Sequence, residues 1–134
     1  MTARQWLKKH PVIYLWLPVA AWMGLIFALS AQPDLPDLDV GWADLLVSSL
    51  AHAFVFGVLA LLWARALGER PYAAWLAFLL TMLYAFSDEF HQAFVPGRVP
   101  DLWDLVCDGL GAGCALLAGV WWRQRRRSSV RVRR

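Results

Sequence analysis

Charge and cysteine are scarce in this chain. Only 17% of its 134 residues are Asp, Glu, Lys or Arg, and it has two cysteines. Cys107 and Cys114 are seven positions apart, which on a helix is about 10 Å along the axis and too far for a mutual disulfide. The chain has no cysteine pair with zinc-site spacing and no Gly-rich phosphate loop. The sequence therefore predicts no cofactor and no zinc site.

Apolar and aromatic residues are abundant instead. Hydrophobic residues make up 60% of the chain, and its mean hydropathy is +0.47. Nine residues are Trp, a side chain that collects at the two interfaces of a membrane. A composition this apolar is typical of proteins that span a bilayer rather than of soluble domains. We therefore expect an integral membrane protein surrounded by lipid.

Four apolar runs are long enough to cross a bilayer as helices. Their expected bounds are residues 12–31, 45–64, 71–94 and 102–122. Pro71 suits a first helical turn, and Pro96 disfavours helical backbone at the preceding residue, so the two prolines mark the ends of the third run. The sequence predicts an all-α, four-helix transmembrane bundle formed by residues 1–122, followed by a basic tail at 123–134.

The distribution of basic residues predicts the orientation. Residues 1–11 hold three Lys or Arg, 65–71 hold two, and 123–134 hold seven, which leaves only Arg98 of the 13 on the other side. Because Lys and Arg near the ends of spans stay in the cytoplasm, we expect both termini to be cytoplasmic and the protein to lie in the cytoplasmic (inner) membrane. The first apolar run is too long for a cleaved signal peptide.

Polar residues gather at the other ends of the third and fourth runs. Asp88, Glu89 and Gln92 lie in the last turns of the third run, and Pro96-Gly97 then predicts a tight turn before Arg98. Because an ionisable side chain at mid-depth in a bilayer costs about 2.5–3.5 kcal/mol, such a cluster indicates a functional site. We expect this site to face the outside of the membrane.

Capping explains part of this cluster. Asp101 and Asp104 have the spacing of a helix N-cap and its third residue. Asp108 lies about 9 Å further along the axis than Leu102, too deep for a capping role. His52 is expected at a similar depth on the second helix, where it is either a helix–helix hydrogen-bonding partner or part of the site.

The predicted site is an outward-facing pocket with six lining residues. They are His52, Asp88, Glu89, Gln92, Arg98 and Asp108.

A combination of motifs resembles the VanZ-like family. The motifs are Asp88-Glu89-Phe90-His91-Gln92, Pro96-Gly97-Arg98, Asp104 with Asp108-Gly109, His52 with Phe56, and Ser30-Ala31-Gln32-Pro33. Asp108 departs from the Asn that is usual in the family, and Ser48-Ser49 replace a common Asp-Lys pair. The resemblance implies a role in the cell envelope, related to resistance to the glycopeptide teicoplanin, and adds Ser30 and Gln32 to the candidate ligand-binding residues.

Three functional classes remain compatible with these residues. In the first, the pocket binds a lipid-linked or cell-wall precursor at the outer leaflet, through Arg98 as a bidentate donor to phosphate or carboxylate. The other candidate ligand-binding residues of this class are Ser30, Gln32, Gln92, Asp104 and Asp108.

The second class is a membrane-embedded hydrolase, in which Glu89 or Asp88 acts with His52 as acid and base. In a variant of this class, Asp88, Glu89 and Asp108 hold a hard cation. The third and least favoured class is a proton-coupled transporter, because the polar residues stop in the outer half.

The basic tail has its own expected partner. Seven arginines follow Trp121-Trp122 directly. A run of this kind next to a span is typical of a cytoplasmic anchor on anionic lipid. We therefore expect anionic lipid, and no nucleic acid, at residues 123–134.

Overall fold

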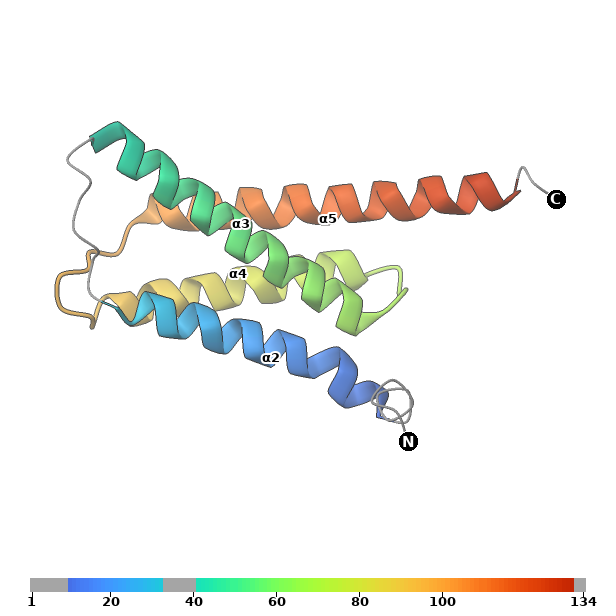
Figure 1. The fold of residues 1–134 in the computed structure, drawn as a ribbon, viewed down its shortest axis with the longest axis horizontal. Coiled ribbons are helices and arrows are strands. Elements are labelled where there is room, and N and C mark those ends of the chain that lie inside the picture. The colour runs from blue at the N-terminus through green and yellow to red at the C-terminus, as the bar shows by residue number, and fades with distance from the viewer. Residues whose placement is uncertain (1–9, 33–40, 132–134) are drawn as a thin grey trace.

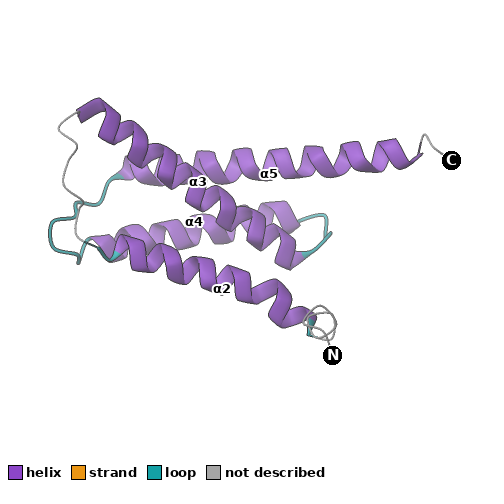
Figure 2. Ribbon diagram, in the orientation of Figure 1, coloured by secondary structure: helices purple, strands orange, loops and turns teal. Residues whose placement is uncertain are grey.

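The computed structural model describes residues 10–32 and 41–131. These ranges contain four α-helices and no strand (Figures 1 and 2): α2 (Pro11–Ser30), α3 (Gly41–Leu67), α4 (Ala73–Gln92) and α5 (Leu102–Arg131). Each helix includes a segment long and apolar enough to cross a membrane. The prediction of an all-α, four-helix transmembrane architecture is confirmed.

Proline and glycine set most of the helix ends. Pro11 is the first residue of α2, where a proline loses no helical hydrogen bond. Gly68 has φ 79° directly after α3, a left-handed conformation that suits glycine at a helix C-terminus. Gly97 has φ 85° in the turn between α4 and α5.

The last helix is longer than the expected span. α5 continues from residue 122 to Arg131. Arg and Gln are good helix formers, and the sequence after Gly119 contains no Gly or Pro to stop the helix. The start of the basic tail is therefore helical.

Helix starts and helix ends are mixed at each end of the bundle, because successive helices run in opposite directions (Figure 1). The end of α2, the start of α3, the end of α4 and the start of α5 lie together at what we call the loop end. The start of α2, the α3–α4 turn and the end of α5 lie at the opposite end, which we call the tail end. All four helices thus run between the same two ends.

Helix α3 organises the bundle. It contacts α2, α4 and α5, and its packing against α5 is the most extensive, whereas the described residues show no packing of α2 on α5. Small residues line the α3–α5 crossing, and Gly57 lies close to the backbone of Gly111. Ala60 and Ala112 are fully buried in the same region. Close backbone approach of this kind is typical of membrane helices, because hydrophobic driving force between them is weak in lipid.

Hydrogen bonds to main-chain carbonyls help to hold α2 against α3 and α4. Trp22 Nε1 donates to the Val55 carbonyl on α3 at 2.9 Å, and the Tyr84 hydroxyl of α4 donates to the Met23 carbonyl at 2.7 Å. Large apolar side chains such as Phe54, Trp75 and Leu117 are exposed on the outside of the bundle. This arrangement, with exposed apolar side chains around polar cross-links, suits a lipid environment.

Candidate functional site

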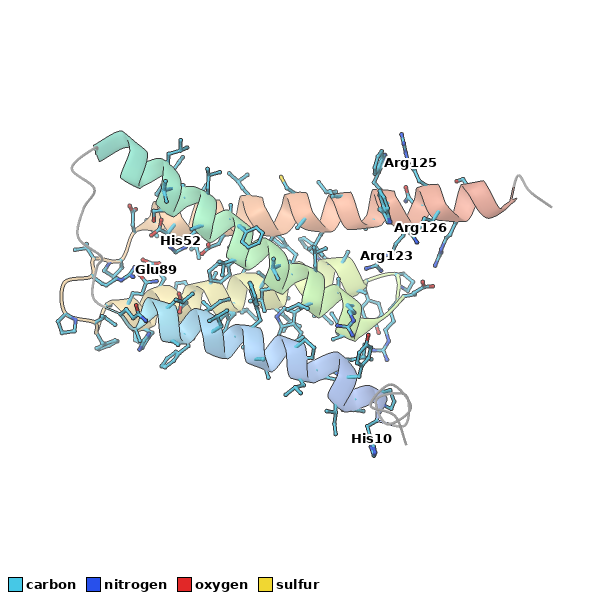
Figure 3. All side chains as sticks on the ribbon, in the orientation of Figure 1. His10, His52, Glu89, Arg123, Arg125 and Arg126 are labelled. Carbon is cyan, nitrogen blue, oxygen red and sulfur yellow. The ribbon has the colours of Figure 1, made fainter. Side chains whose placement is uncertain are left out.

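A cavity of about 140 Å³ lies near the loop end, between α2, α3 and α4. Its apolar wall comes from α2 and α3: Ile26, Leu29, Ala51, Val55 and Phe56. Its polar lining is Ser30, His52, Asp88, Gln92 and Arg98. In Figure 3, His52 and Glu89 lie toward this end, and Arg123, Arg125 and Arg126 lie toward the other.

A buried carboxylate joins α2 to α4 inside the cavity. Asp88 is 5% exposed. The Ser30 hydroxyl donates to its Oδ1 at 2.6 Å, and Gln92 Nε2 donates to its Oδ2 at 3.1 Å. Gln92 reaches Asp88 because the two residues are one helical turn apart. Both carboxylate oxygens of Asp88 therefore have a neutral hydrogen-bond donor.

A second polar pair joins α3 to α5. His52 Nδ1 lies 3.1 Å from Asp108 Oδ1, and His52 Nε2 lies 3.7 Å from Asp104 Oδ2. Asp108 is 2% exposed. Asp104 and Asp108 share one face of α5 because they are four residues apart. Only Asp108 lies within hydrogen-bond distance of the ring, and a protonated imidazole would in addition attract the carboxylate of Asp104.

Arg98 closes the cavity from the turn between α4 and α5. Its backbone N–H bonds to the Val95 carbonyl at 3.1 Å, and its Nε donates to the Gln32 carbonyl at 3.1 Å. The turn is possible because Gly97 adopts a positive φ. Gln32 contributes its backbone oxygen to this contact, and Arg98 is the cationic side chain of the cavity lining.

Glu89 has a different environment from Asp88. Its Oε1 accepts the backbone N–H of Asp101. Asp101 Oδ1 in turn accepts the N–H of Trp103 at 2.8 Å, which is the N-cap contact that the sequence spacing predicts. Trp103 Nε1 donates to Ser49 Oγ at 3.2 Å and links α5 to α3. Glu89 therefore supports the start of α5.

The structure separates the predicted pocket residues into two neighbouring groups. Asp88, Gln92 and Arg98 line the cavity together with His52. Asp108 and Asp104 contact the His52 ring from α5 and are not part of the lining. Of the residues expected to line the pocket, Glu89 and Asp108 thus lie outside it. No group of three or more His, Cys, Asp or Glu within 10–32 and 41–131 is arranged to hold one metal ion.

Sequence reasoning named Phe56 and His91 only as motif residues and missed the rest of the apolar lining. Ile26 is four residues before Ser30, and Val55 and Phe56 are three and four residues after His52, so helical spacing from the polar residues would have found them. His91 stacks on Phe27 with ring centroids 4.4 Å apart, and its Nδ1 is buried with no partner among the described residues.

Comparisons with known proteins agree with the motifs. The chain is 31% identical over 87 residues to an uncharacterized protein of Schizosaccharomyces pombe, a match that covers 63% of this chain and 54% of the relative. The chain thus spans about half the length of that relative. No solved structure gives a significant match. The model of the VanZ/LLP1 family matches residues 2–123, and the chain is therefore a member of the VanZ/LLP1 family and a multi-pass membrane protein.

Proposed function

We propose that the protein binds the polar headgroup of a membrane lipid or of a lipid-linked envelope component in the loop-end cavity. The observation that carries this proposal is the composition of the cavity lining, which combines apolar side chains of α2 and α3 with the polar side chains of Ser30, His52, Asp88, Gln92 and Arg98. A ligand that matches both surfaces has an apolar part and a polar or charged part. In a bilayer, lipids are the abundant molecules of that kind.

The apolar wall gives such a ligand a route to the bilayer. Leu29 on α2 and Ala51 on α3 both line the cavity and are themselves exposed, Leu29 to 50%. The cavity therefore communicates with the outside of the bundle between these two helices. An acyl or prenyl chain can lie against this apolar opening while the headgroup contacts the polar lining, so that neither part is desolvated without a partner.

We also propose that the loop end faces the outside of the cytoplasmic membrane and that the tail end faces the cytoplasm. The basic residues of the described ranges support this orientation, since all except Arg98 lie at the tail end. Arg125 lies over the Trp121 ring at 3.9 Å and Arg126 over the Trp122 ring at 5.2 Å. This combination of indole and guanidinium suits an interface with anionic lipid.

The orientation predicts the behaviour of a topology reporter. Alkaline phosphatase, which is active only outside the cytoplasm, is expected to be inactive when it is fused after Arg134 and active when it is inserted after Gly97. The reason is the preference of Lys and Arg for the cytoplasmic side of a span. The activities of the two fusions, normalised to their abundance, check the prediction, and the reverse pattern would place the cavity on the cytoplasmic side.

The proposed ligand gives the protein a role in the cell envelope, which family membership also suggests. We propose that occupancy of the cavity by a lipid-linked wall precursor alters susceptibility to glycopeptides such as teicoplanin. A strain with the gene deleted and complemented by wild-type or variant chains measures this role directly.

Arg98→Lys is expected to weaken lipid binding by about tenfold, since a bidentate guanidinium contact to phosphate is lost while the positive charge remains. The measurement is the amount of lipid that copurifies with the full chain, together with glycopeptide susceptibility of the complemented strain. Asp101→Asn is the matched control at the same end of the bundle, because Asn caps a helix about as well as Asp. Equal lipid content in wild type, Arg98→Lys and Asp101→Asn would contradict the proposal.

A second candidate function is hydrolysis of the bound lipid. The specific observation in its favour is that His52 lines the cavity and is oriented by a hydrogen bond to the buried Asp108. A base oriented by a carboxylate is the arrangement of several hydrolases. Asp88 and Glu89 are engaged by other donors, so His52 is the favoured base of the three. Release of free headgroup or of lysolipid by wild type, in the same lipid samples, would identify this activity.

A further inference from the structure

We infer that the cavity takes a zwitterionic headgroup of the phosphoethanolamine type, with its ammonium against Asp88 and its phosphate against Arg98. This inference rests on the proposed function, because it assigns the chemical class of the ligand of that cavity.

Asp88 is buried in the cavity with neutral hydrogen-bond partners. This side chain is 95% buried, and among the described residues no Lys, Arg or His nitrogen lies within 4.0 Å of its oxygens. Its two partners, Ser30 and Gln92, are neutral. Burying a carboxylate away from water is costly unless a cation compensates it. No cationic side chain of the described ranges is in direct contact with Asp88, so we assign the compensating cation to the ligand.

The Asp88 carboxylate can accept more hydrogen bonds than Ser30 and Gln92 donate to it. An ionised carboxylate has about four lone-pair sites, and Ser30 and Gln92 occupy two of them. Since Asp88 also lines the cavity, a donor placed there can reach the remaining sites. A primary ammonium carries three N–H donors, so it can satisfy Asp88 without displacing either neutral partner.

The same cavity offers further contacts to such a headgroup. Phe56 is 2% exposed and lines the cavity, and an aromatic face attracts a nearby cation. Arg98 lines it from the loop side, and a guanidinium suits phosphate oxygens. The volume of about 140 Å³ far exceeds the roughly 10–15 Å³ that a single water molecule requires. A ligand with both charges complements an Asp and an Arg in one cavity.

Matched lipids test the inference on the intact chain. Wild-type protein is purified in detergent and mixed with dioleoyl phosphatidylethanolamine, phosphatidylglycerol or phosphatidylcholine, and bound lipid is counted by native mass spectrometry. We expect phosphatidylethanolamine to bind about tenfold or more tightly than phosphatidylglycerol, since a hydrogen bond to a charged group contributes on that order. Phosphatidylcholine is expected to bind less well than phosphatidylethanolamine, because its trimethylated nitrogen has no N–H to donate.

Asp88→Asn is expected to remove this preference, so that phosphatidylethanolamine binds no more tightly than phosphatidylglycerol. Asp101→Asn, in the same buffer, should retain the preference. Competition by free O-phosphoethanolamine distinguishes recognition of the headgroup alone from recognition of the whole lipid. If Asp88→Asn does not yield a monodisperse helical protein, the three-lipid series with wild type decides the question.

Each contrary result has a distinct meaning. Equal binding of the three lipids by wild type, with all three weakened by Arg98→Lys, would overturn the zwitterion inference and leave the proposed lipid-binding function intact. A folded Asp88→Asn chain that keeps the preference would make Asp88 a structural link between α2 and α4 and also overturn the inference. Wild type that binds none of the lipids and retains none on purification would overturn both.

Discussion

Gly111→Ala is expected to disrupt the packing of α3 on α5 and to lower the abundance of folded protein severely. A Cβ atom built on Gly111 would lie far inside van der Waals contact of the Ala53 carbonyl oxygen. That oxygen belongs to the α3 backbone, so no side-chain rotation relieves the clash and the two helices must separate. Overpacking of this kind typically costs about 1–3 kcal/mol, occasionally more. Thermal stability in detergent and the yield of monodisperse protein measure the effect.

Gly113→Ala is the matched control on the same helix. A Cβ atom built there would lie 4.0 Å from Phe78 Cε2, which is an ordinary contact. The exchange of residues is identical, so the change in helix propensity is the same at both positions. The control is expected to have near wild-type stability. Similar behaviour of the two variants would mean that α3 and α5 do not approach each other as closely as the structure has them.

The number and placement of the helices follow from the sequence because each span is a long apolar run. The expected bounds are close to the observed ones for α2 and α4, whereas α3 is longer than the expected 45–64 and runs from Gly41 to Leu67. Its end is followed by Gly68 in a left-handed conformation. The extension of α5 to Arg131 was not predicted, since hydropathy defines where lipid contact ends and not where the helix ends. Good helix formers continue a helix into water.

The site could be predicted in part. The depth of Asp108 along α5 excludes capping and brings it level with His52, and the structure has the two side chains 3.1 Å apart. The different roles of Asp88 and Glu89 could not be derived. Consecutive residues point about 100° apart on a helix, and both faces of α4 near its end carry polar as well as apolar residues. In the structure Asp88 continues the buried face of α4 that includes Thr81 and Ala85, and Ser30 of α2 bonds to it there.

The Arg98 contact with the Gln32 carbonyl was also beyond sequence reasoning. It depends on how the turn after α4 folds back over the end of α2, and both residues lie outside the regular helices. Helical periodicity relates residues within one element and gives no relation between a turn and a helix end that is distant in sequence. Such contacts become visible only when the packing of the helices is known.

His52→Ala is expected to destabilise the bundle by about 1–3 kcal/mol, because it leaves a buried carboxylate acceptor without its donor. Asp108 is 2% exposed, and His52 is its one hydrogen-bond donor among the described residues. The effect should exceed the average of about 0.6 kcal/mol for polar pairs between membrane helices, where the separated helices find other partners. Chemical denaturation of the purified chain in mixed micelles, followed by circular dichroism, measures the loss.

A double-mutant cycle measures the coupling free energy between His52 and Asp108 apart from their contacts with other residues. Asp108→Leu removes the buried acceptor but keeps the branching and the number of side-chain heavy atoms, and His52→Ala leaves space for the larger methyl groups. The variant that combines the two changes should therefore regain much of the stability lost in His52→Ala alone. Asp108→Asn should be mild, since the amide oxygen still accepts from His52 Nδ1. If the two losses instead add, His52 and Asp108 are not coupled. If Asp108→Asn is as harmful as His52→Ala, the negative charge of Asp108, rather than its hydrogen bond, holds α3 and α5 together at this depth.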